Sequence, residues 1–372
     1  MNILMCSDSY YPHPGGVSEY LHYLGTYLRK RGHTVTILAP HYAEPYQDDA
    51  YTKRIGRCYY ITANMATITI TFHPRLPLLV RDYMRTQSFD VVHTNGPLGY
   101  TLPYWAFHYS RSINVATFHT AFTGFNLYRF AKLIFKNEFQ TKRLAAVYPS
   151  HKAYRTTYPH FPTPYRIIPN GIDTTKFNPD VRPLKKFPAG PKILFLGRLD
   201  PRKGFIRLLA AFPEVKKRIP NALLIVVGSG PLRAQYERMI PDTLRGSVFF
   251  EGRVTHDLIP RYYATGDVYV SPATGGEVFG IVLTEAMATG TPVVASNIPG
   301  YNEVVTHGKN GLLFNVAEIH DIAEKIIAVL TNQHLSRSLS KQGRQYAETV
   351  SWQNVARMVE EFYVHLIEQH EK

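Results

Sequence analysis

The sequence predicts an α/β protein with two doubly wound domains, and three observations lead to this prediction. The chain has 372 residues, which exceeds the roughly 100–200 residues of an ordinary domain. Short β-branched runs alternate with longer amphipathic stretches from end to end, a pattern typical of parallel sheets with helices on both faces. Residues 171–191 are rich in proline, glycine and lysine, lack periodicity and divide the alternation into two halves.

The expected strands form two sets. The first set is residues 2–7, 34–40, 89–94, 114–120, 145–150 and 166–170. The second set is residues 192–197, 222–228, 248–252, 267–272, 291–296 and 311–314. The last stretch has a helical pattern with no strand after it, so it could cross back to the first domain. We therefore expect a first domain at 1–170, a linker at 171–191, a second domain at 192–350 and a C-terminal helix at 351–372.

The formal net charge is +14 at pH 7, and the sequence pI is about 9.6. Such an excess of positive charge favours anionic partners, namely phosphates, nucleic acid or an acidic membrane face. No RNA-recognition, zinc-finger or basic-helix signature is present, so nucleic acid is not an expected partner.

The cysteines and the apolar segments predict the compartment. Cys6 and Cys58 are the only two cysteines; they make neither a disulfide framework nor a zinc site, which favours a reducing, cytoplasmic setting. No segment has about 20 continuous apolar residues, so no transmembrane helix is expected. The amino terminus, MNILMCSDSYYP, turns polar too early for a signal peptide.

Ligands of open α/β sheets bind outside the carboxyl ends of the strands, so we expect a ligand in the cleft between the two domains. Gly15 and Gly16 follow the first strand at a helix start, where the backbone can approach an anion closely. An ordinary strand–helix turn explains them equally well. Arg198 and Lys203 follow the strand at 192–197 and suit a diphosphate, with solvated surface charge as the alternative.

Two glutamates, Glu277 and Glu285, flank an expected helix start near Phe279 and Gly280. The free N–H groups at that terminus favour a phosphate. Glu285 lies one turn inside the helix and could accept hydrogen bonds from both hydroxyls of a ribose. Glu277 precedes the helix and could accept hydroxyls of a sugar attached to the diphosphate. An exposed glutamate and a helix-capping acid are the alternative explanations.

His119 ends the strand at 114–120 and is expected to face the cleft. A histidine there can donate to a sugar hydroxyl or take part in proton transfer. A structural histidine is as common at a strand end.

A basic, aromatic tract covers residues 125–143. Arg129, Lys132 and Lys136 recur at helical spacing, and another face carries Leu127, Phe130, Leu133 and Ile134. This pattern is typical of a helix at a membrane interface, although a domain helix with a solvated basic rim fits equally well. Together with the net charge, it favours peripheral binding to acidic lipid.

The segments PGGV, FHT, IPNGID, FLGRLDPRKG, VVGSGP and GGEVFGIVLTEAMATGTPVVAS together resemble glycosyltransferase family 4. The resemblance covers nearly the whole chain. Its most specific parts are the E-x7-E pair, Glu277 and Glu285, and the R-x4-K pair, Arg198 and Lys203. Within the family it is strongest to bacterial phosphatidylinositol mannosyltransferases. It implies the GT-B fold, in which two Rossmann-like domains face a cleft, and transfer with retention of configuration.

The resemblance also implies roles for single residues. Arg198 and Lys203 hold the donor diphosphate, Glu277 the transferred sugar, and Glu285 the ribose. His119 lies near the anomeric carbon, and the base lies near Val254. The implied donor-binding set is Gly15, Gly16, Arg198, Lys203, Val254, Glu277, Phe279, Gly280, Ile281, Val282 and Glu285; the implied catalytic set is His119, Arg198, Lys203 and Glu277.

The implied reaction moves a hexose, mannose from GDP-mannose, to a phosphatidylinositol-type or other lipid hydroxyl at the membrane surface. No Asp-x-Asp motif is present, so neither a metal nor another cofactor is expected. The stretch 41–88 matches no part of the family that would identify the acceptor.

Several other readings stay open. One alternative is a transferase of the same fold that uses a UDP-glucose donor and a soluble sugar or glycolipid acceptor. The others are an epimerase, a phosphorylase and a non-catalytic two-lobed sugar-binding protein. A nicotinamide enzyme is disfavoured, because Arg233 stands where the dinucleotide fingerprint requires its third glycine.

Overall fold

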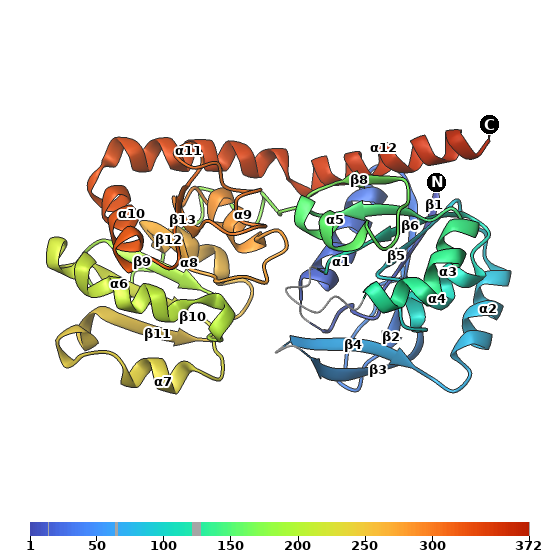
Figure 1. The fold of residues 1–372 in the computed structure, drawn as a ribbon, viewed down its shortest axis with the longest axis horizontal. Helices are drawn as coiled ribbons and strands as arrows, with labels where there is room; N and C mark the ends of the chain where they lie inside the picture. Colours follow the sequence, from blue (N-terminus) through green and yellow to red (C-terminus); the bar gives the residue numbers. More distant parts are fainter. Residues whose placement is uncertain (14, 64–65, 121–127, 372) are drawn as a thin grey trace. The chain divides into compact units, whose positions relative to one another are not determined.

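A computed structural model describes residues 1–13, 15–63, 66–120 and 128–371 (Figure 1). The chain divides into two compact units, Met1–Gly171 with Trp352–Lys372 and Ile172–Ser351. The C-terminal helix therefore belongs to the first unit. Residues 172–191, which we expected as a linker, belong to the second.

The first unit is built on an eight-stranded sheet with the order β4-β3-β2-β1-β5-β6-β7-β8. All neighbouring strands are parallel except β3 and β4, which are antiparallel. The strands are β1 (Asn2–Cys6), β2 (Thr34–His41), β3 (Thr52–Ala63), β4 (Ala66–Phe72), β5 (Val91–Asn95), β6 (Ile113–Thr117), β7 (Ala145–Tyr148) and β8 (Tyr165–Ile167).

The six strands predicted for the first half are all present, but the pair β3 and β4 was not predicted. The reason lies in its burial pattern. Tyr59, Tyr60 and Ile61 are all exposed on β3, although they are consecutive and point alternately to the two faces. A strand pair at the edge of a sheet that is exposed to solvent on both faces shows no alternation of apolar and polar residues. That alternation is the main sequence signal for a strand.

Helices cover both faces of the first sheet. On one face, α1 (Gly16–Lys30) and α12 (Trp352–His370) pack against Ile3 and Met5. On the other face, α2 (Leu76–Thr86) and α3 (Leu102–Tyr109) pack against Leu4 and Cys6. The helix α4 (Tyr128–Thr141) lies against α3 through aromatic contacts such as Phe107–Phe139, and α5 (His151–Thr157) follows β7. Along β1, Ile3 and Met5 face one helix layer, and Leu4 and Cys6 face the other. This alternation is expected of a parallel strand that is buried on both faces.

The second unit is built on a six-stranded, fully parallel sheet with the order β11-β10-β9-β12-β13-β14. Its strands are β9 (Lys192–Leu196), β10 (Leu223–Val227), β11 (Val248–Gly252), β12 (Val268–Ser271), β13 (Val293–Ser296) and β14 (Leu312–Phe314). All six were predicted.

The helices of the second unit also form two layers. α6 (Phe205–Arg218) and α10 (Ile319–Thr331) share one core with Ile193, while α8 (Ile259–Thr265) and α9 (Ile281–Ala288) share the other with Leu194. The remaining helices are α7 (Arg233–Arg238) and α11 (Gln333–Thr349), with short 3₁₀ turns at η1 (Pro201–Lys203) and η2 (Asp242–Ser247). Both units are therefore doubly wound α/β folds, as the sequence predicted.

Candidate functional site

The loops that follow β9, β10 and β12 meet at the carboxyl ends of the strands of the second sheet, because neighbouring parallel strands end on the same side. We call this side the carboxyl edge of the sheet. The backbones of the loops touch. Gly204, with φ at +64°, presses against the loop after β12, and a Cβ there would lie 1.9 Å from the carbonyl oxygen of Pro272. Only glycine fits this approach. The loop bearing Arg198 and Lys203 is thereby fixed to the loop bearing Glu277.

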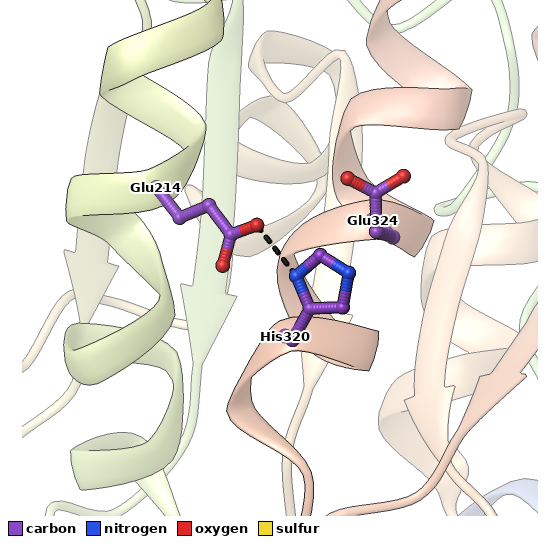
Figure 2. Close-up of side chains that lie close together, drawn as sticks. All are labelled: Glu214, His320 and Glu324. Carbon is purple, nitrogen blue, oxygen red and sulfur yellow. Dashed lines mark hydrogen bonds and ion pairs between the residues drawn. The ribbon is translucent and has the colours of Figure 1, made fainter.

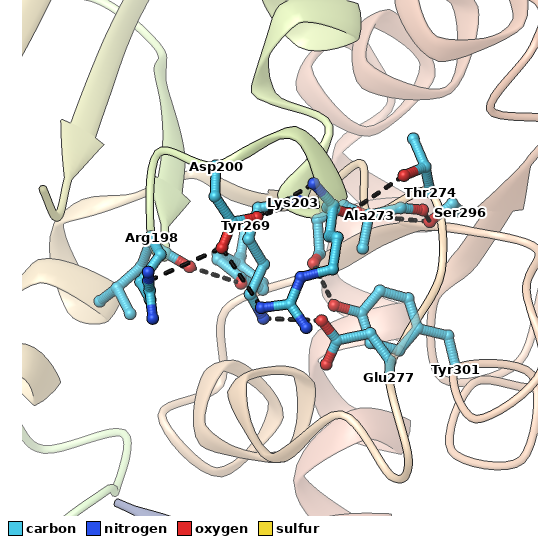
Figure 3. Close-up of polar contacts among 12 residues, drawn as sticks. Arg198, Asp200, Lys203, Tyr269, Ala273, Thr274, Glu277, Ser296 and Tyr301 are labelled. Carbon is cyan, nitrogen blue, oxygen red and sulfur yellow. Dashed lines mark hydrogen bonds and ion pairs between the residues drawn. The ribbon is translucent and has the colours of Figure 1, made fainter. Parts of the chain in front are cut away.

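Asp200 holds the two expected diphosphate-binding cations in place (Figure 3). Its side chain is almost fully buried, and its Oδ1 accepts hydrogen bonds from the backbone N–H groups of Arg202 (3.0 Å) and Lys203 (3.2 Å). Its Oδ2 lies 3.6 Å from Arg198 Nε. Asp200 was not predicted as a site residue, although an aspartate directly before Pro201 is a recognisable helix-capping signal.

Lys203 and Glu277 form an ion pair, with Lys203 Nζ donating to Glu277 Oε1 at 2.7 Å (Figure 3). The side chains are 24% and 16% exposed, so water screens the pair only in part. Arg198, with 54% of its side chain exposed, remains open to an anion. Two cations, Arg198 and Lys203, thus lie beside two carboxylates, those of Asp200 and Glu277, and Arg198 is the more exposed of the two cations.

Glu285 lies one turn inside α9, where its Oε2 accepts a hydrogen bond from the Tyr263 hydroxyl at 2.8 Å. A second phenol, Tyr269, lies near both glutamates. Burial is the main cause that raises the pKa of Tyr269, and the charges of Glu285 and Glu277 raise it further. The hydroxyl of Tyr269 donates to the Leu196 carbonyl at 3.2 Å, which orients it at the end of β9.

The start of α9 offers unsatisfied N–H groups. Gly280 caps it with φ at +83° and no side-chain cap bond, and a Cβ there would lie 2.8 Å from the Tyr301 ring. The side chain of Phe279 is buried in the core, so only its backbone could reach a ligand, whereas Ile281 and Val282 are half-buried. Free N–H groups at a helix start favour an anion.

Three further residues were expected to bind the donor: Val254, Gly15 and Gly16. Val254 follows β11 by two residues and is half-buried at the same sheet edge. Gly15 and Gly16 are in the first unit, where Gly15 caps α1 without a side-chain bond. Among the described residues, nothing beyond its chain neighbours lies within 4 Å of a Cβ built at Gly15.

At the carboxyl edge of the first sheet, His119 Nε2 donates to Asn95 Oδ1 at 2.7 Å. Burial lowers the pKa of His119 to about 4, so the imidazole is neutral near pH 7 and its Nδ1 can accept a hydrogen bond. Asn95 Nδ2 is buried, with no hydrogen-bond partner among the described residues. Its N–H groups could therefore donate to water or to a ligand oxygen. Asn95 was not predicted, since a lone asparagine after a strand resembles a turn residue.

The expected interfacial tract forms α4, and its residues 125–127 lie outside the described part. Tyr128, Phe135 and Phe139 are buried against the unit. Phe130, Leu133 and Ile134 are exposed, Leu133 at 79%. Arg129 and Lys136 are exposed and Lys132 is half-buried. The helix therefore has an inner apolar face and an outer apolar face beside its cations.

Within the described ranges, one cluster of side chains has the spacing of a metal site: Glu214, His320 and Glu324 (Figure 2). It lies on α6 and α10, outside the loops at the sheet edge. His320 Nδ1 is hydrogen-bonded to Glu214 Oε1 at 2.6 Å, and Arg218 pairs with Glu324 at 2.6 Å. These contacts make the cluster an ion-pair network. Separately, no described helix has the length and apolarity needed to cross a bilayer.

Comparisons with known proteins agree with this geometry. The family model "Glycosyltransferase Family 4" matches residues 14–176, and "Glycosyl transferases group 1" matches residues 177–346. Phosphatidyl-myo-inositol mannosyltransferase of Mycobacterium tuberculosis is 33% identical over 360 residues, covering 94% of this chain and 93% of the relative.

Two more distant similarities extend the comparison. The GDP-mannose-dependent alpha-(1-6)-phosphatidylinositol monomannoside mannosyltransferase of the same species is 25% identical, covering 94% of both chains. The fold is similar to that of sucrose-phosphate synthase from Thermosynechococcus elongatus, with a TM-score of 0.74, 24% identity and 99% coverage of both chains. The protein therefore belongs to glycosyltransferase family 4 and is a glycosyltransferase with two α/β domains of the GT-B type.

Proposed function

We propose that this glycosyltransferase moves mannose from GDP-mannose to the hydroxyl of a phosphatidylinositol-type lipid, with retention and without a bound metal. The observation that carries the proposal is the arrangement of Arg198, the Lys203–Glu277 pair and the start of α9 at one sheet edge. Two cations and a helix N-terminus suit a diphosphate, and one carboxylate suits sugar hydroxyls. The two mannosyltransferases to which the chain is similar suggest the donor and the lipid class.

The leaving group is the nucleotide diphosphate, and its developing charge needs stabilisation. Arg198 and Lys203 supply it, together with the N–H groups of α9; such electrostatic stabilisation is commonly the largest catalytic contribution. When the diphosphate binds, the Lys203 ammonium donates hydrogen bonds both to Glu277 and to the phosphate. Glu277 is then held in place to accept hydroxyls of mannose, and Glu285 accepts those of the ribose.

The chemistry at the anomeric carbon is proposed to need no charged side chain. His119 contacts the sugar as a neutral imidazole, and Asn95 donates from Nδ2 to an oxygen of the sugar or acceptor. The acceptor hydroxyl attacks on the face that the phosphate leaves. The departing phosphate takes the proton, and configuration is retained.

The acceptor is reached at an acidic membrane surface, at the inner face of the plasma membrane. The outer face of α4 supports this part of the proposal, since its exposed apolar residues would enter the interface while its cations meet anionic headgroups. The alternatives of the same class are a UDP-glucose donor and a soluble or glycolipid acceptor.

A donor and acceptor panel tests the proposal. Purified enzyme is incubated with GDP-mannose, UDP-glucose or an ADP-sugar, each with phosphatidylinositol vesicles or with free inositol, and products are read by mass spectrometry. We expect a mannosylated lipid from GDP-mannose alone, with an α-linkage by NMR. Transfer from UDP-glucose to free inositol, with none from GDP-mannose, would overturn the proposal.

A further inference from the structure

A polar cavity lies in the first unit at the amino ends of the strands, opposite to the carboxyl ends that carry His119 and Asn95. Its volume is about 480 Å³. Residues that immediately precede β5 and β6 line it, including Phe89 and Ser112. These are the amino ends of the strands, whereas His119 follows the carboxyl end of β6. The cavity is therefore separate from the residues proposed for transfer.

The lining of this cavity is strongly basic. It contains four cations, Arg81, Arg85, Arg111 and Lys142, and among the residues that line it none is acidic. Three serine hydroxyls, of Ser88, Ser110 and Ser112, also line it. Hydroxyls and cations without carboxylates make a surface that suits an anion with several oxygen acceptors.

Helix ends explain part of this charge. Three helices, α2, α3 and α4, end around the cavity, and cations near a helix C-terminus balance its carbonyl dipoles. Lys142 serves in this way, because its Nζ donates to the Ser110 carbonyl at 3.0 Å. Arg81 pairs with its exposed neighbour Asp82 at 3.0 Å.

Arg85 lies in the last turn of α2 and so also balances the dipole of that helix, whereas Arg111 follows the end of α3 by two residues. Both residues are exposed. Neither makes an ion pair or a side-chain hydrogen bond with any residue in the described parts of the chain, yet both line the same cavity. The one nearby acid of α4, Glu138, is engaged by the hydroxyl of Tyr104 at 2.8 Å and by His108 at 2.5 Å.

We infer that this cavity binds a phosphate group, held by the guanidinium groups of Arg85 and Arg111. The planar fork of arginine matches two phosphate oxygens at once, and the hydroxyls of Ser88 and Ser110 can donate to the remaining oxygens. The hydroxyl of Ser112 already donates to the Phe89 carbonyl at 2.7 Å. The phosphate belongs either to a small soluble molecule or to a lipid headgroup. This site does not depend on the proposed donor or acceptor, because none of its residues belongs to that set.

The test compares two double variants of the full chain that lose the same charge. Arg85→Gln with Arg111→Gln removes the inferred phosphate ligands. Arg155→Gln with Arg337→Gln is the control, because both of these arginines are exposed and neither lines the cavity. Binding of inorganic phosphate and of glycerol phosphate is measured by calorimetry. We expect the first double variant to bind at least about tenfold more weakly than the control, since charge-assisted bonds are lost.

A vesicle experiment identifies the source of the phosphate. Vesicles with phosphatidic acid are compared with phosphatidylcholine vesicles, in a background in which Arg129, Lys132 and Lys136 are changed to glutamate so that α4 does not contribute. Loss of binding specific to the Arg85/Arg111 variant in this experiment, but not with soluble phosphates, assigns a lipid headgroup. Equal binding by the two double variants in every experiment would overturn the inference. Donor hydrolysis should be unchanged in both, which separates this site from the proposed function.

Discussion

The polar side chains proposed for the reaction differ in charge between the two units. The carboxyl end of the second sheet carries Arg198, Lys203, Glu277 and Glu285. Asp200 bonds the backbone of the cation loop, and the buried phenol of Tyr263 bonds Glu285. The edge of the first unit carries a neutral imidazole bonded to an amide, His119 to Asn95. Stabilising a diphosphate requires fixed charges, whereas positioning neutral hydroxyls requires donors and acceptors without charge. On the proposed function, the two halves of the chain divide the reaction in this way.

The division also extends to the partners. In the second unit, Arg198 lies beside Asp200 and Lys203 pairs with Glu277, so the site is preorganised for one ligand. In the first unit, α4 exposes cations and apolar side chains to solvent, which suits a broad anionic surface and no single ligand. The predictions below test whether membrane binding and donor binding can be lost independently.

The largest effect is expected from changing Arg129, Lys132 and Lys136 together to glutamate. Cations near an anionic surface contribute about 1 kcal/mol each, so vesicle binding should fall by about a hundredfold or more. Co-sedimentation with vesicles of rising anionic lipid content measures it, and binding by the unchanged protein should weaken with added salt. Nucleotide binding should be intact. Equal recovery on neutral and anionic vesicles would contradict membrane binding by α4.

In the second unit, Lys203→Ala should lower kcat/KM for transfer by about tenfold to a hundredfold, since a hydrogen bond to a charged group contributes about 1.5–3 kcal/mol and Glu277 loses its partner. Vesicle binding should not change. Lys325→Ala is the matched control, because it breaks the ion pair with Asp321 on α10 instead. Full turnover in a correctly folded Lys203→Ala enzyme would show that this cation does not hold the diphosphate.

The fold and the ionic part of the site could be read from the sequence, because they depend on local signals. Parallel buried strands give continuous apolar runs, and the spacing of Glu277 from Glu285 and of Arg198 from Lys203 is visible without a structure. The supporting residues could not be found in this way. Tyr263 and Tyr269 look like core residues of a helix and a strand, and their role arises from contacts with distant glutamates.

Asn95 and the β3–β4 pair were missed for related reasons. The buried, unpaired Nδ2 of Asn95 depends on what surrounds it in space, and sequence does not record this. At residues 59–61 of β3, side chains on both faces of the sheet are exposed to solvent. The sequence there lacks the alternation of apolar and polar residues that identifies a strand.

A smaller effect should separate the two glutamates. Glu285→Ala is expected to weaken the free nucleoside diphosphate and the nucleotide sugar alike, by about tenfold, as one or two hydrogen bonds to a carboxylate are lost. Glu277→Ala should chiefly slow transfer and spare nucleotide binding. Glu285→Gln is a useful control, because its amide oxygen can still accept from Tyr263. If both alanine variants lose nucleotide affinity equally, the proposed roles are wrong.

The last effect concerns pH and the His119–Asn95 pair of the first unit. Burial lowers the pKa of His119 to about 4 from an ordinary value of 6.5. Between these values the unfolded chain binds more protons at this site than the folded chain, so the contribution of His119 to stability rises with pH and is lost as pH falls towards 4. His93, whose pKa burial lowers to about 3, acts in the same direction. Asp8 opposes both, because burial raises its pKa to about 6.

Replacing His119 with glutamine removes the titrating group while keeping a donor for Asn95. The free energy of unfolding of the variant should therefore depend less steeply on pH between about 4 and 6.5, by about 3 kcal/mol across the window, since one pKa unit corresponds to about 1.4 kcal/mol. Chemical denaturation at several pH values measures this slope, and NMR titration of the imidazole measures its pKa directly. A midpoint near 6.5, or an unchanged slope in the variant, would mean that the imidazole is charged at mildly acidic pH. The His119–Asn95 pair would then carry charge, as the site in the second unit does. The proposed division between a charged donor site and a neutral sugar site would fail.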